Sequence, residues 1–239
     1  MEANLIEKLF GVGAHYGLNS SRRHPATKRF LFGQKGGVEL FDLEKTANLL
    51  NTALEAIAAL AKERKTILFV GGQAQAREAV QRTAEGLGQP FVASRWIGGS
   101  LTNWGEIRKR LNRLEEIATM KETGELAKFT KRERLMIDRE AADLELMFGG
   151  LRGMTKIPDA LFIVDPRAEM KSVAEAKALN IPVIALLNSD CSTESITYPI
   201  PANDASRETI QFVLAEVSKA YSTNLGAKPQ ETNGNSGAN

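Results

Sequence analysis

Hydrophobic and polar positions divide the chain into short apolar runs separated by amphipathic stretches. Runs rich in β-branched and large apolar residues predict strands at 29–32, 38–41, 66–70, 91–93, 160–164 and 181–187. Apolar residues at helical spacing predict helices at 43–63, 73–87, 169–178 and 206–221, and Asp42 can cap the first of them. Because strands alternate with helices, the pattern predicts an α/β fold built on a doubly wound parallel sheet of the flavodoxin-like kind.

Residues 104–151 break this alternation, because they contain no strand pattern. Two stretches, 104–118 and 137–151, carry apolar residues three and four positions apart, and Gly124 suits a turn between them. Each stretch has one narrow apolar stripe and is otherwise charged. This pattern predicts an antiparallel helical hairpin, or coiled coil, that projects from the sheet domain. Two ordinary crossover helices packed on the sheet are the alternative, and they would need wider apolar faces.

The predicted organisation is an α/β sheet domain made of residues 1–103 and 152–221, with the helical hairpin inserted at 104–151. Residues 222–239 offer almost nothing to bury and are predicted to form a disordered tail. A length of 239 residues, of which 43% are hydrophobic, is enough for a core of this size. No apolar run approaches the roughly 20 residues of a membrane helix, and the first residues lack a signal-peptide start, so we expect a cytoplasmic protein.

The charge distribution is more informative than the net charge of +2. No Asp or Glu lies between Glu7 and Glu39. That interval contains six basic residues, which are Lys8, Arg22, Arg23, Lys28, Arg29 and Lys35. The segment predicts an anionic partner, and without one its self-repulsion is expected to keep it loose. A solvated surface segment is the alternative.

Residues 94–104 combine groups that suit a nucleic-acid backbone. Arg95 supplies a cation, Trp96 supplies a plane for stacking, and two following glycines allow close approach of the backbone. Thr102 and Asn103 supply side-chain hydrogen bonds at the start of a basic helix. We therefore expect this corner of the fold to contact phosphate.

The basic helix that follows extends this surface. Its cations are Arg108, Lys109, Arg110 and Arg113. Lys109 and Arg113 lie opposite the apolar stripe, where a phosphate would offset their mutual repulsion. The alternative is a solvated face on which Glu106 and Glu116 neutralise these cations.

Motifs for nucleotide chemistry are incomplete. The turn at Gly71 and Gly72 follows a predicted strand but lacks both the G-x-G-x-x-G spacing and the Lys-Ser/Thr pair of a P-loop. The glycines within 11–17 also have the wrong spacing. We expect no nucleotide or other cofactor, and we interpret these turns as structural.

Catalytic candidates are isolated as well. They are His15, His24, Asp165, Cys191 and Asp204. No serine lies in a nucleophile-elbow sequence, and Asp165 is interpreted as a local cap before the next helix. A single cysteine and two histidines exclude an internal disulfide and leave no Cys/His cluster for structural zinc. The sequence thus predicts a protein that is not an enzyme.

Several blocks of sequence together resemble the bacterial family of small-subunit ribosomal protein number two. The blocks lie, in family order, at 11–17, 22–33, 67–71, 94–104, 157–167, 181–186 and 198–204. The resemblance implies a flavodoxin-like sheet with an inserted helical hairpin. It also implies binding to small-subunit ribosomal RNA near the junction of head and body, contact with neighbouring ribosomal proteins, and help in docking the large messenger-binding protein number one. The RNA-binding residues expected on this basis are Arg22, Arg23, Lys28, Arg29, Arg95, Trp96, Asn103, Arg108, Lys109, Arg110 and Arg113.

The chain departs from the family pattern at some positions. Leu18 stands where members often have a second histidine, and Asn188 stands where they have an acid that with Asp204 could hold a metal ion. Only His15 and Asp204 remain of that set, so no metal site is expected and the docking surface for protein number one is altered. Arg23 and His24 replace the usual aromatic residue and asparagine before Pro25. Two other classes stay open: a small-molecule enzyme on a flavodoxin-like sheet, and a helical-hairpin adaptor that binds only protein.

Overall fold

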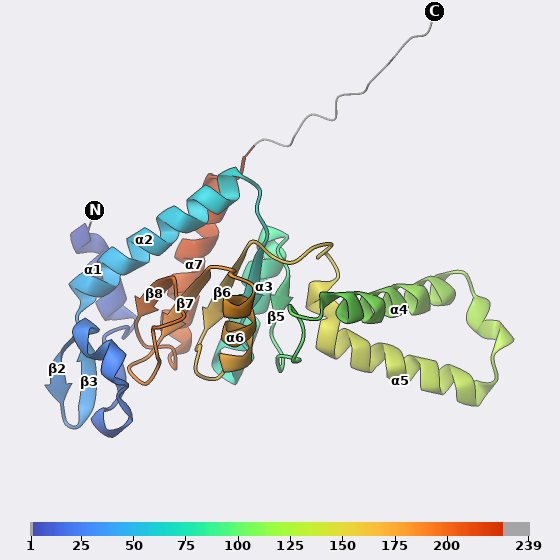
Figure 1. Ribbon diagram of the computed structural model, residues 1–239, viewed down its shortest axis with the longest axis horizontal. Helices are drawn as coiled ribbons and strands as arrows, with labels where there is room; N and C mark the ends of the chain where they lie inside the picture. The colour runs from blue at the N-terminus through green and yellow to red at the C-terminus, as the bar shows by residue number, and fades with distance from the viewer. Residues whose placement is uncertain (1, 227–239) are drawn as a thin grey trace, which may run out of the picture.

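A central sheet with helices on both faces carries a helical hairpin at one end in the computed structural model, which describes residues 2–226 (Figure 1). Five parallel strands form the sheet in the order β5-β4-β6-β7-β8. Their bounds are Ile67–Val70 for β4, Phe91–Val92 for β5, Ala160–Val164 for β6, Val183–Leu187 for β7 and Tyr198–Pro201 for β8. Numbered from β4, this is the 2-1-3-4-5 order of flavodoxin-like folds, so the predicted fold class is confirmed.

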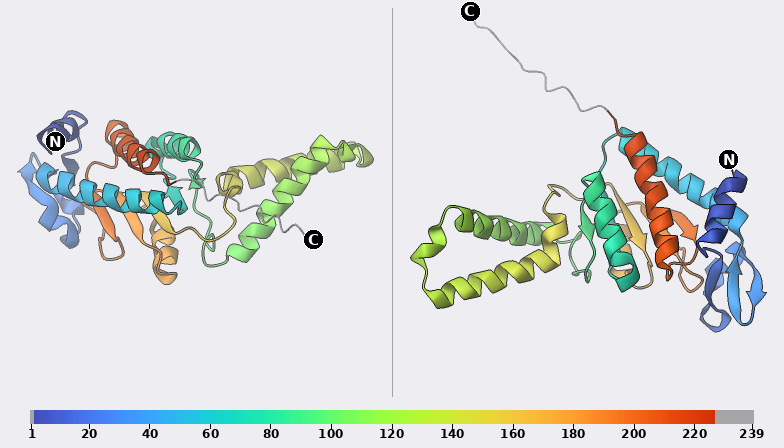
Figure 2. Two further views of the ribbon diagram at one scale, coloured as in Figure 1. Left: turned by 90° about the horizontal axis from the view of Figure 1, so that it is seen from above. Right: turned by 180° about the vertical axis from the view of Figure 1, so that it is seen from behind.

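Successive strand residues face opposite sides of the sheet and contribute to two separate cores. On one side, Phe69 and Phe162 share a core with residues of α2, α3 and α7, and α3 and α7 lie side by side over that face (Figure 2). On the other side, Leu68 and Leu161 pack with α6, the loop that contains Trp96, and the base of the hairpin. The bounds of these helices are Leu43–Lys62 for α2, Ala74–Leu87 for α3, Met170–Ala178 for α6 and Arg207–Thr223 for α7. Because β4, β6 and β7 are buried throughout, they read as continuous apolar runs in the sequence.

The amino-terminal residues form a second sheet that the sequence analysis did not predict. Helix α1 (Glu2–Gly11) leads into three antiparallel strands in the order β1-β3-β2. These strands are β1 (Tyr16–Asn19), β2 (Leu31–Lys35) and β3 (Val38–Phe41), and β1 is followed by a short 3₁₀ helix, η1 (Ser20–Arg22). The strand expected at 29–32 is wrong in its first half, because another 3₁₀ helix, η2 (Pro25–Phe30), occupies those positions.

The hairpin consists of α4 (Trp104–Glu122) and α5 (Lys131–Phe148), joined through the 3₁₀ helix η3 (Glu125–Lys128). Its base is buried: Leu111 and Phe148 belong to the same core as the second face of the sheet, and η4 (Gly149–Leu151) continues that core. Farther out, the two helices diverge (Figure 1), and Leu135 and Met136 of α5 are exposed. A coiled coil along the full length of the hairpin is therefore not confirmed.

Helix α7 runs past the predicted start of the tail at residue 222 and ends at Thr223. Beyond it, the N–H of Gly226 donates to the carbonyl oxygen of Ala61 (3.2 Å), and Arg64 Nε donates to the carbonyl oxygen of Gly226 (2.8 Å). Gly226 is thus docked on the end of α2, and residues 227–239 of the predicted tail lie outside the described residues. None of the helices within 2–226 is long and apolar enough to span a membrane.

Candidate nucleic-acid interface

The basic amino-terminal segment is anchored to the central sheet by Ser189, the second residue after the end of β7. The carbonyl oxygen of this buried residue accepts hydrogen bonds from the N–H of His24 (2.8 Å) and the hydroxyl of Thr27 (2.6 Å). The Ser189 hydroxyl accepts from the N–H of Leu18 (3.0 Å), and His24 also caps η2. These contacts hold the segment against the sheet, in contrast to the loose segment that self-repulsion predicted.

Carboxylates remote in sequence neutralise two cations of this segment. Arg22 forms an ion pair with Asp190 (3.3 Å), which Arg167 also contacts, and Arg23 forms one with Glu39 (3.0 Å). The two carboxylate side chains are only 6% and 3% exposed; Arg23 neutralises the buried charge of Glu39, and Arg22 together with Arg167 neutralises that of Asp190. Arg22 and Arg23 therefore position the segment, and their charges are less available to a partner than the sequence suggested.

Lys28 and Arg29 are different, because both are exposed and neither forms an ion pair with a carboxylate anywhere in residues 2–226. They line a surface cavity of about 680 Å³ together with Lys45, which is paired with Asp42. The Arg29 guanidinium lies 4.7 Å from the centroid of the Phe30 ring, which fixes its position over the end of η2. We call Lys28 and Arg29 the amino-terminal basic patch.

The loop at 94–104 is organised by one carboxylate, that of Glu175 in α6. One of its oxygens accepts from Trp96 Nε1 (2.9 Å) and the N–H of Gly99 (2.8 Å). The other accepts from the N–H groups of Leu101 (2.9 Å) and Thr102 (3.1 Å) and from the Thr102 hydroxyl (3.2 Å). Burial acts to raise the pKa of Glu175, but these hydrogen bonds outweigh it and hold the pKa below its ordinary value. Glu175 is not among the residues that the sequence predicts, because an isolated glutamate on a helix gives no signal of such a role.

Trp96 does not have the role that the sequence suggested. Its side chain is 4% exposed and packs in the core of the second sheet face, so the expectation of an exposed stacking plane is contradicted. Asn103 is exposed at the start of α4 but its side chain makes no capping hydrogen bond. Arg95 is exposed, and it forms no ion pair within the described part of the chain. Of the groups expected here to contact phosphate, Arg95 is the available cation.

Two cations of the basic helix are engaged in ion pairs. Lys109 Nζ lies 2.6 Å from a carboxylate oxygen of Glu106. Arg113 donates two hydrogen bonds of 3.1 Å to Glu140 of α5 and also reaches Glu116 (3.5 Å). The Arg113 guanidinium lowers the pKa of Glu140, as expected of a direct pair. The arrangement agrees with the alternative of a salt-bridged face for these two residues.

The other two cations of α4 differ in their surroundings. The Arg108 guanidinium donates to the carbonyl oxygen of Met154 (3.4 Å) and lies 4.0 Å from the carboxylate of Glu115. The first contact joins α4 to the segment that follows η4 at the base of the hairpin. Arg110 is exposed and has no ion-pair partner among the described residues. On this side of the molecule, Arg110 and Arg95 are therefore the predicted cations that are free to contact an anion.

Two basic residues that the sequence did not predict as RNA-binding lie in the same cavity as Arg95. Arg77 of α3 and Lys171 of α6 line the same cavity of about 540 Å³, where the sheet domain meets the hairpin. The sequence analysis missed both, because they are remote from Arg95 along the chain. The topology of the sheet could have indicated them. Arg77 lies in the first turn of the helix after β4, and Lys171 lies in the first turn of the helix after β6. Because β4 and β6 are parallel neighbours, their carboxyl ends lie at the same edge of the sheet and bring the two helix starts together.

The crevice between β4 and β6, where flavodoxin-like folds bind ligands, is filled by the protein itself. The N–H of Gly72 donates to a carboxylate oxygen of Glu169 (3.0 Å), and Gln73 donates to Asp165. A Cβ atom at Gly72 would lie 2.6 Å from the carbonyl oxygen of Ser94, so glycine is required for packing. Burial raises the pKa of Glu169. Its carboxyl group accepts the hydrogen bond from the N–H of Gly72, which a nucleotide phosphate at this turn would need. These contacts support the interpretation of the glycine turn as structural.

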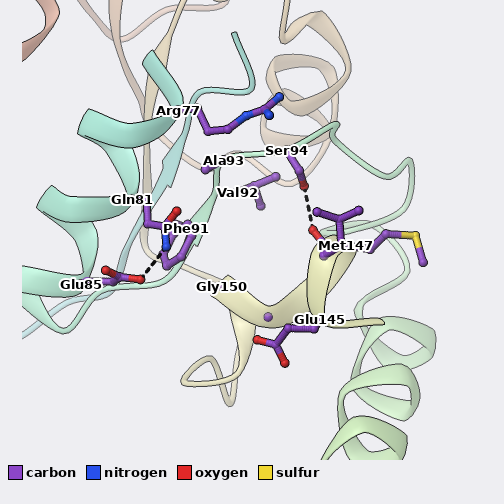
Figure 3. A pocket seen from close by; sticks show the side chains of 12 residues that line it. Arg77, Gln81, Glu85, Phe91, Val92, Ala93, Ser94, Glu145, Met147 and Gly150 are labelled. Carbon is purple, nitrogen blue, oxygen red and sulfur yellow. Dashed lines mark hydrogen bonds between the residues drawn. The ribbon is translucent and has the colours of Figure 1, made fainter. Parts of the chain in front are cut away.

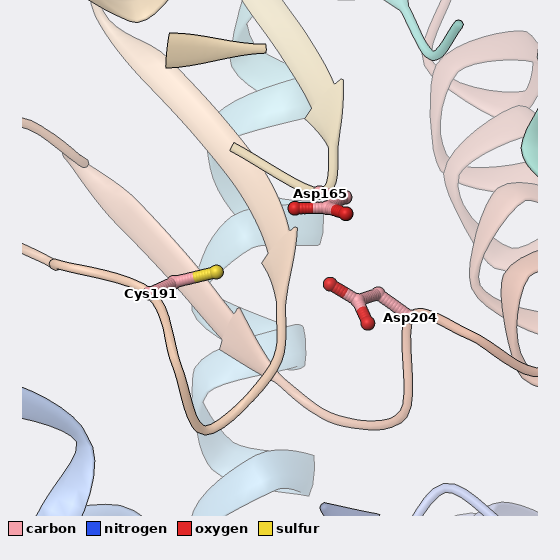
Figure 4. Close-up of side chains that lie close together, drawn as sticks. All are labelled: Asp165, Cys191 and Asp204. Atoms are coloured by element: carbon pink, nitrogen blue, oxygen red, sulfur yellow. The ribbon is translucent and has the colours of Figure 1, made fainter. Parts of the chain in front are cut away.

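Asp165, Cys191 and Asp204 converge beside this crevice, with their ligand atoms within 4.8 Å of one another (Figure 4). Both oxygens of Asp165 already accept hydrogen bonds, and one oxygen of Asp204 accepts from the Asn188 amide (2.7 Å). Burial raises the pKa of the Cys191 thiol and raises that of Asp204 to about 7. A protonated thiol, and carboxylates of which three of the four oxygens already accept hydrogen bonds, fit a metal ion poorly.

The histidines lie apart from this cluster. The His15 ring stacks on Phe10 at 4.6 Å and lies 4.0 Å from the Tyr16 ring, and burial lowers its pKa. His24 uses its Nδ1 to accept from the N–H of Ala26. The structure therefore brings three of the sequence's catalytic candidates together, Asp165, Cys191 and Asp204, and leaves both histidines outside that cluster.

Comparison with known proteins gives one consistent result. The family model described as Ribosomal protein S2 matches residues 9–224. A relative from Mycobacterium sp. (strain KMS) is 38% identical over 96% of this chain and 81% of its own length. Relatives from Sulfurimonas denitrificans and Campylobacter curvus are 40% and 38% identical over 90% and 96% of this chain, and over 83% and 88% of their own lengths. All three carry the name Small ribosomal subunit protein uS2.

Proposed function

The chain belongs to the ribosomal protein S2 family, and from this membership we propose that it is a structural constituent of the small ribosomal subunit. In this role it binds small-subunit ribosomal RNA and neighbouring ribosomal proteins and supports translation. The family match covers the sheet domain and the hairpin alike, so both parts belong to the proposed function. The family implies a structural and not a catalytic role.

One observation supports RNA contact most strongly, and it is the geometry of the amino-terminal basic patch. Lys28 and Arg29 are exposed without ion-pair partners in the described chain, yet η2 holds them in place through the buried Thr27 and Phe30. Cations held on a fixed backbone lose little conformational freedom when they meet phosphate. This is the property expected of a surface that positions a protein on a nucleic-acid backbone.

A second contact surface lies at the base of the hairpin. Arg95 and Arg110 are its exposed, unpaired cations within residues 2–226, and the loop pinned by Glu175 joins Arg95 to the start of α4. Lys109 and Arg113 contribute less, because binding phosphate would compete with their existing carboxylate partners. RNA binding by these residues, and docking of the messenger-binding protein number one, stay predictions.

The two other classes that the sequence left open are less well supported. An enzyme on this fold would use the crevice between β4 and β6, but the carboxylate of Glu169 occupies the amide of Gly72 there. An adaptor that binds only protein gives no reason for two surfaces of unpaired cations. Contact with RNA accounts for both surfaces of unpaired cations.

The proposal is tested by co-sedimentation of the full chain with small subunits across a salt series. The wild-type chain should pellet at low salt and dissociate as salt rises, because phosphate contacts release counterions. Lys28→Gln with Arg29→Gln should dissociate at lower salt and show a shallower salt dependence. Lys62→Gln with Lys219→Gln is the matched control, since these exposed lysines lie at the carboxyl ends of α2 and α7, on the opposite edge of the sheet.

Two results would count against the proposal. Failure of the wild-type chain to co-sediment at any salt concentration would remove the subunit role. Co-sedimentation that is independent of salt would remove the RNA contact, because a protein-mediated association does not release phosphate counterions.

A further inference from the structure

The surface cavity between the sheet domain and the base of the hairpin is lined by segments from four parts of the chain. Arg77 of α3, Arg95 and Ile97 of the loop, Lys171 of α6, and Leu146 and Met147 of α5 line it. Its volume of about 540 Å³ falls within the range of roughly 300–1,000 Å³ for small-ligand sites. We call it the junction cavity.

The junction cavity is lined by three cations and by no carboxylate. Arg77, Arg95 and Lys171 form no ion pair with any described residue. Arg77 donates one hydrogen bond to the carbonyl oxygen of Gly72 (3.2 Å), which orients the guanidinium and leaves most of its five donors free. Three like charges around one cavity repel each other, and an anion between them removes that repulsion.

The adjoining cavity has the opposite character. Beyond Ser94 and Met147, the groove continues into a space of about 340 Å³ that Glu85 and Glu145 line (Figure 3). Arg77 lies on the boundary between the two spaces. Glu145 is paired with Arg152, but the neighbouring space still presents the carboxylate of Glu85, so the junction cavity is the more favourable of the two spaces for an anion.

The wall opposite the cations is apolar and exposed. Leu146 is 72% exposed and Met147 is 37% exposed, although both lie beside a hydrophobic core. The hydroxyl of Ser94 donates to the carbonyl oxygen of Leu146 (3.1 Å), so this wall is tied to the sheet domain (Figure 3). A ligand that matches the cavity carries an anionic group and a flat or apolar group close to it. A simple inorganic anion leaves the apolar wall unused, and an apolar peptide leaves the cations unpaired.

We propose that the junction cavity binds one unstacked nucleotide from a single-stranded segment of small-subunit ribosomal RNA. Its phosphate contacts Arg77, Arg95 and Lys171, and its base lies against Leu146 and Met147. A nucleotide inside a duplex keeps its base stacked and cannot reach the apolar wall, so the site selects a loop or bulge. The inference rests on the proposed function, and it adds that RNA joins the hairpin to the sheet domain at this point.

Binding of the full chain to small-subunit ribosomal RNA across a salt series tests the proposal. Arg77→Gln with Lys171→Gln should weaken binding at least about tenfold near 0.1 M salt and reduce the slope of log K against log salt by about one to two. Leu146→Ser should weaken binding several-fold and leave that slope unchanged, because it removes apolar contact and no charge. A fully paired RNA duplex should bind the wild-type chain and each variant alike.

Matched controls separate the cavity from general effects. Lys62→Gln with Lys219→Gln removes two charges at the opposite edge of the sheet, and Leu135→Ser changes an exposed leucine of the same helix, α5. Both controls should bind RNA as the wild type does. Thermal denaturation of every variant shows whether it is folded, and the exposure of the substituted side chains predicts that all are.

Three outcomes would overturn the inference. If the wild type binds the RNA and the cavity variants bind it with unchanged affinity and slope, the cavity is not an RNA site while the proposed function stands. If the variants bind RNA normally but assemble poorly into subunits when other ribosomal proteins are present, the occupant is a protein. If the wild type binds no RNA, the proposed function fails and this inference fails with it.

Discussion

The carboxylate of Glu175 accepts five hydrogen bonds from the loop that precedes the hairpin, so replacing it by an amide should destabilise the whole corner. Glu175→Gln keeps the shape of the side chain and removes its charge. The amide oxygen can still accept from Trp96 and Gly99. The amide nitrogen is a donor and would face the backbone N–H groups of Leu101 and Thr102, which then lose their acceptor.

The size of the effect follows from the exposure of these groups. Thr102 is exposed, so water can replace its acceptor, whereas Leu101 is buried and its unsatisfied N–H costs about 1–3 kcal/mol. The two remaining hydrogen bonds lose their charge assistance, at a cost of about 1 kcal/mol or less each. The sum is about 3 kcal/mol, which corresponds to a decrease in melting temperature of roughly 6–12 °C for a chain of this size.

Thermal denaturation measured as a function of pH distinguishes this account from a general loss of packing. The hydrogen bonds hold the folded-state pKa of Glu175 below its ordinary value of 4.5. The carboxylate therefore stabilises the fold fully above about pH 4.5, and this stabilisation is lost as the pH falls through the lower folded-state pKa. Glutamine does not titrate, so the difference in melting temperature between wild type and variant should narrow below pH 4.5.

Glu55→Gln provides the control, because Glu55 is exposed on α2 and should tolerate the change. The reasoning would be refuted if Glu175→Gln melted within a degree or two of the wild type at pH 7. A large difference that persists unchanged down to pH 3 would refute it as well, since the carboxylate charge would then have no part in the effect.

The remaining predictions concern three other parts of the chain. Lys109→Gln with Arg113→Gln should cost at most about 1 kcal/mol in thermal stability and should reduce subunit association less than loss of the unpaired cations does, since both residues are already paired; an equal loss in co-sedimentation would contradict this. Calorimetry with ATP, NAD and FMN should detect no micromolar binding at the glycine turn, and Gly72→Ala should lower the melting temperature because its methyl group would meet a carbonyl oxygen. A chain ending at residue 221 should melt a few degrees below one ending at 226, because it loses the contacts with the end of α2; equal melting temperatures would show that these contacts contribute nothing.

The sequence predicts the strands that are buried on both faces and also the edge strand β5, but it misses the edge strands β8 and β1. The strands β4, β6 and β7 are continuous apolar runs, and their alternation with helices was sufficient to identify the sheet. The strand β8 contains two prolines, which only an edge strand tolerates, so its pattern argued against a strand. The strand β1 reads Tyr-Gly-Leu-Asn, which has neither alternation nor a run of apolar residues. The strands β8 and β1 depend on tertiary pairing that local patterns do not contain.

The candidate interface shows a similar limit. The cations of the amino-terminal segment are evident from the sequence, but their partners are not. Glu39 pairs with Arg23, and Asp190 pairs with Arg22, only because the fold brings β3 and the segment after β7 beside η1. Which cations stay unpaired is therefore a tertiary property. The same holds for Trp96, whose burial depends on a glutamate in a distant helix.

The most direct test of the central claim is a cryo-electron microscopy structure of small subunits assembled with this chain. The account predicts that Lys28, Arg29 and Arg95 lie within hydrogen-bonding distance, about 3 Å, of phosphate oxygens of the ribosomal RNA. It also predicts that, in the assembled subunit, the carboxylate of Glu175 still accepts hydrogen bonds from the loop at 94–104. A map in which the chain is present and these three side chains face solvent or only protein, or in which the chain is absent from the subunit, would contradict the account.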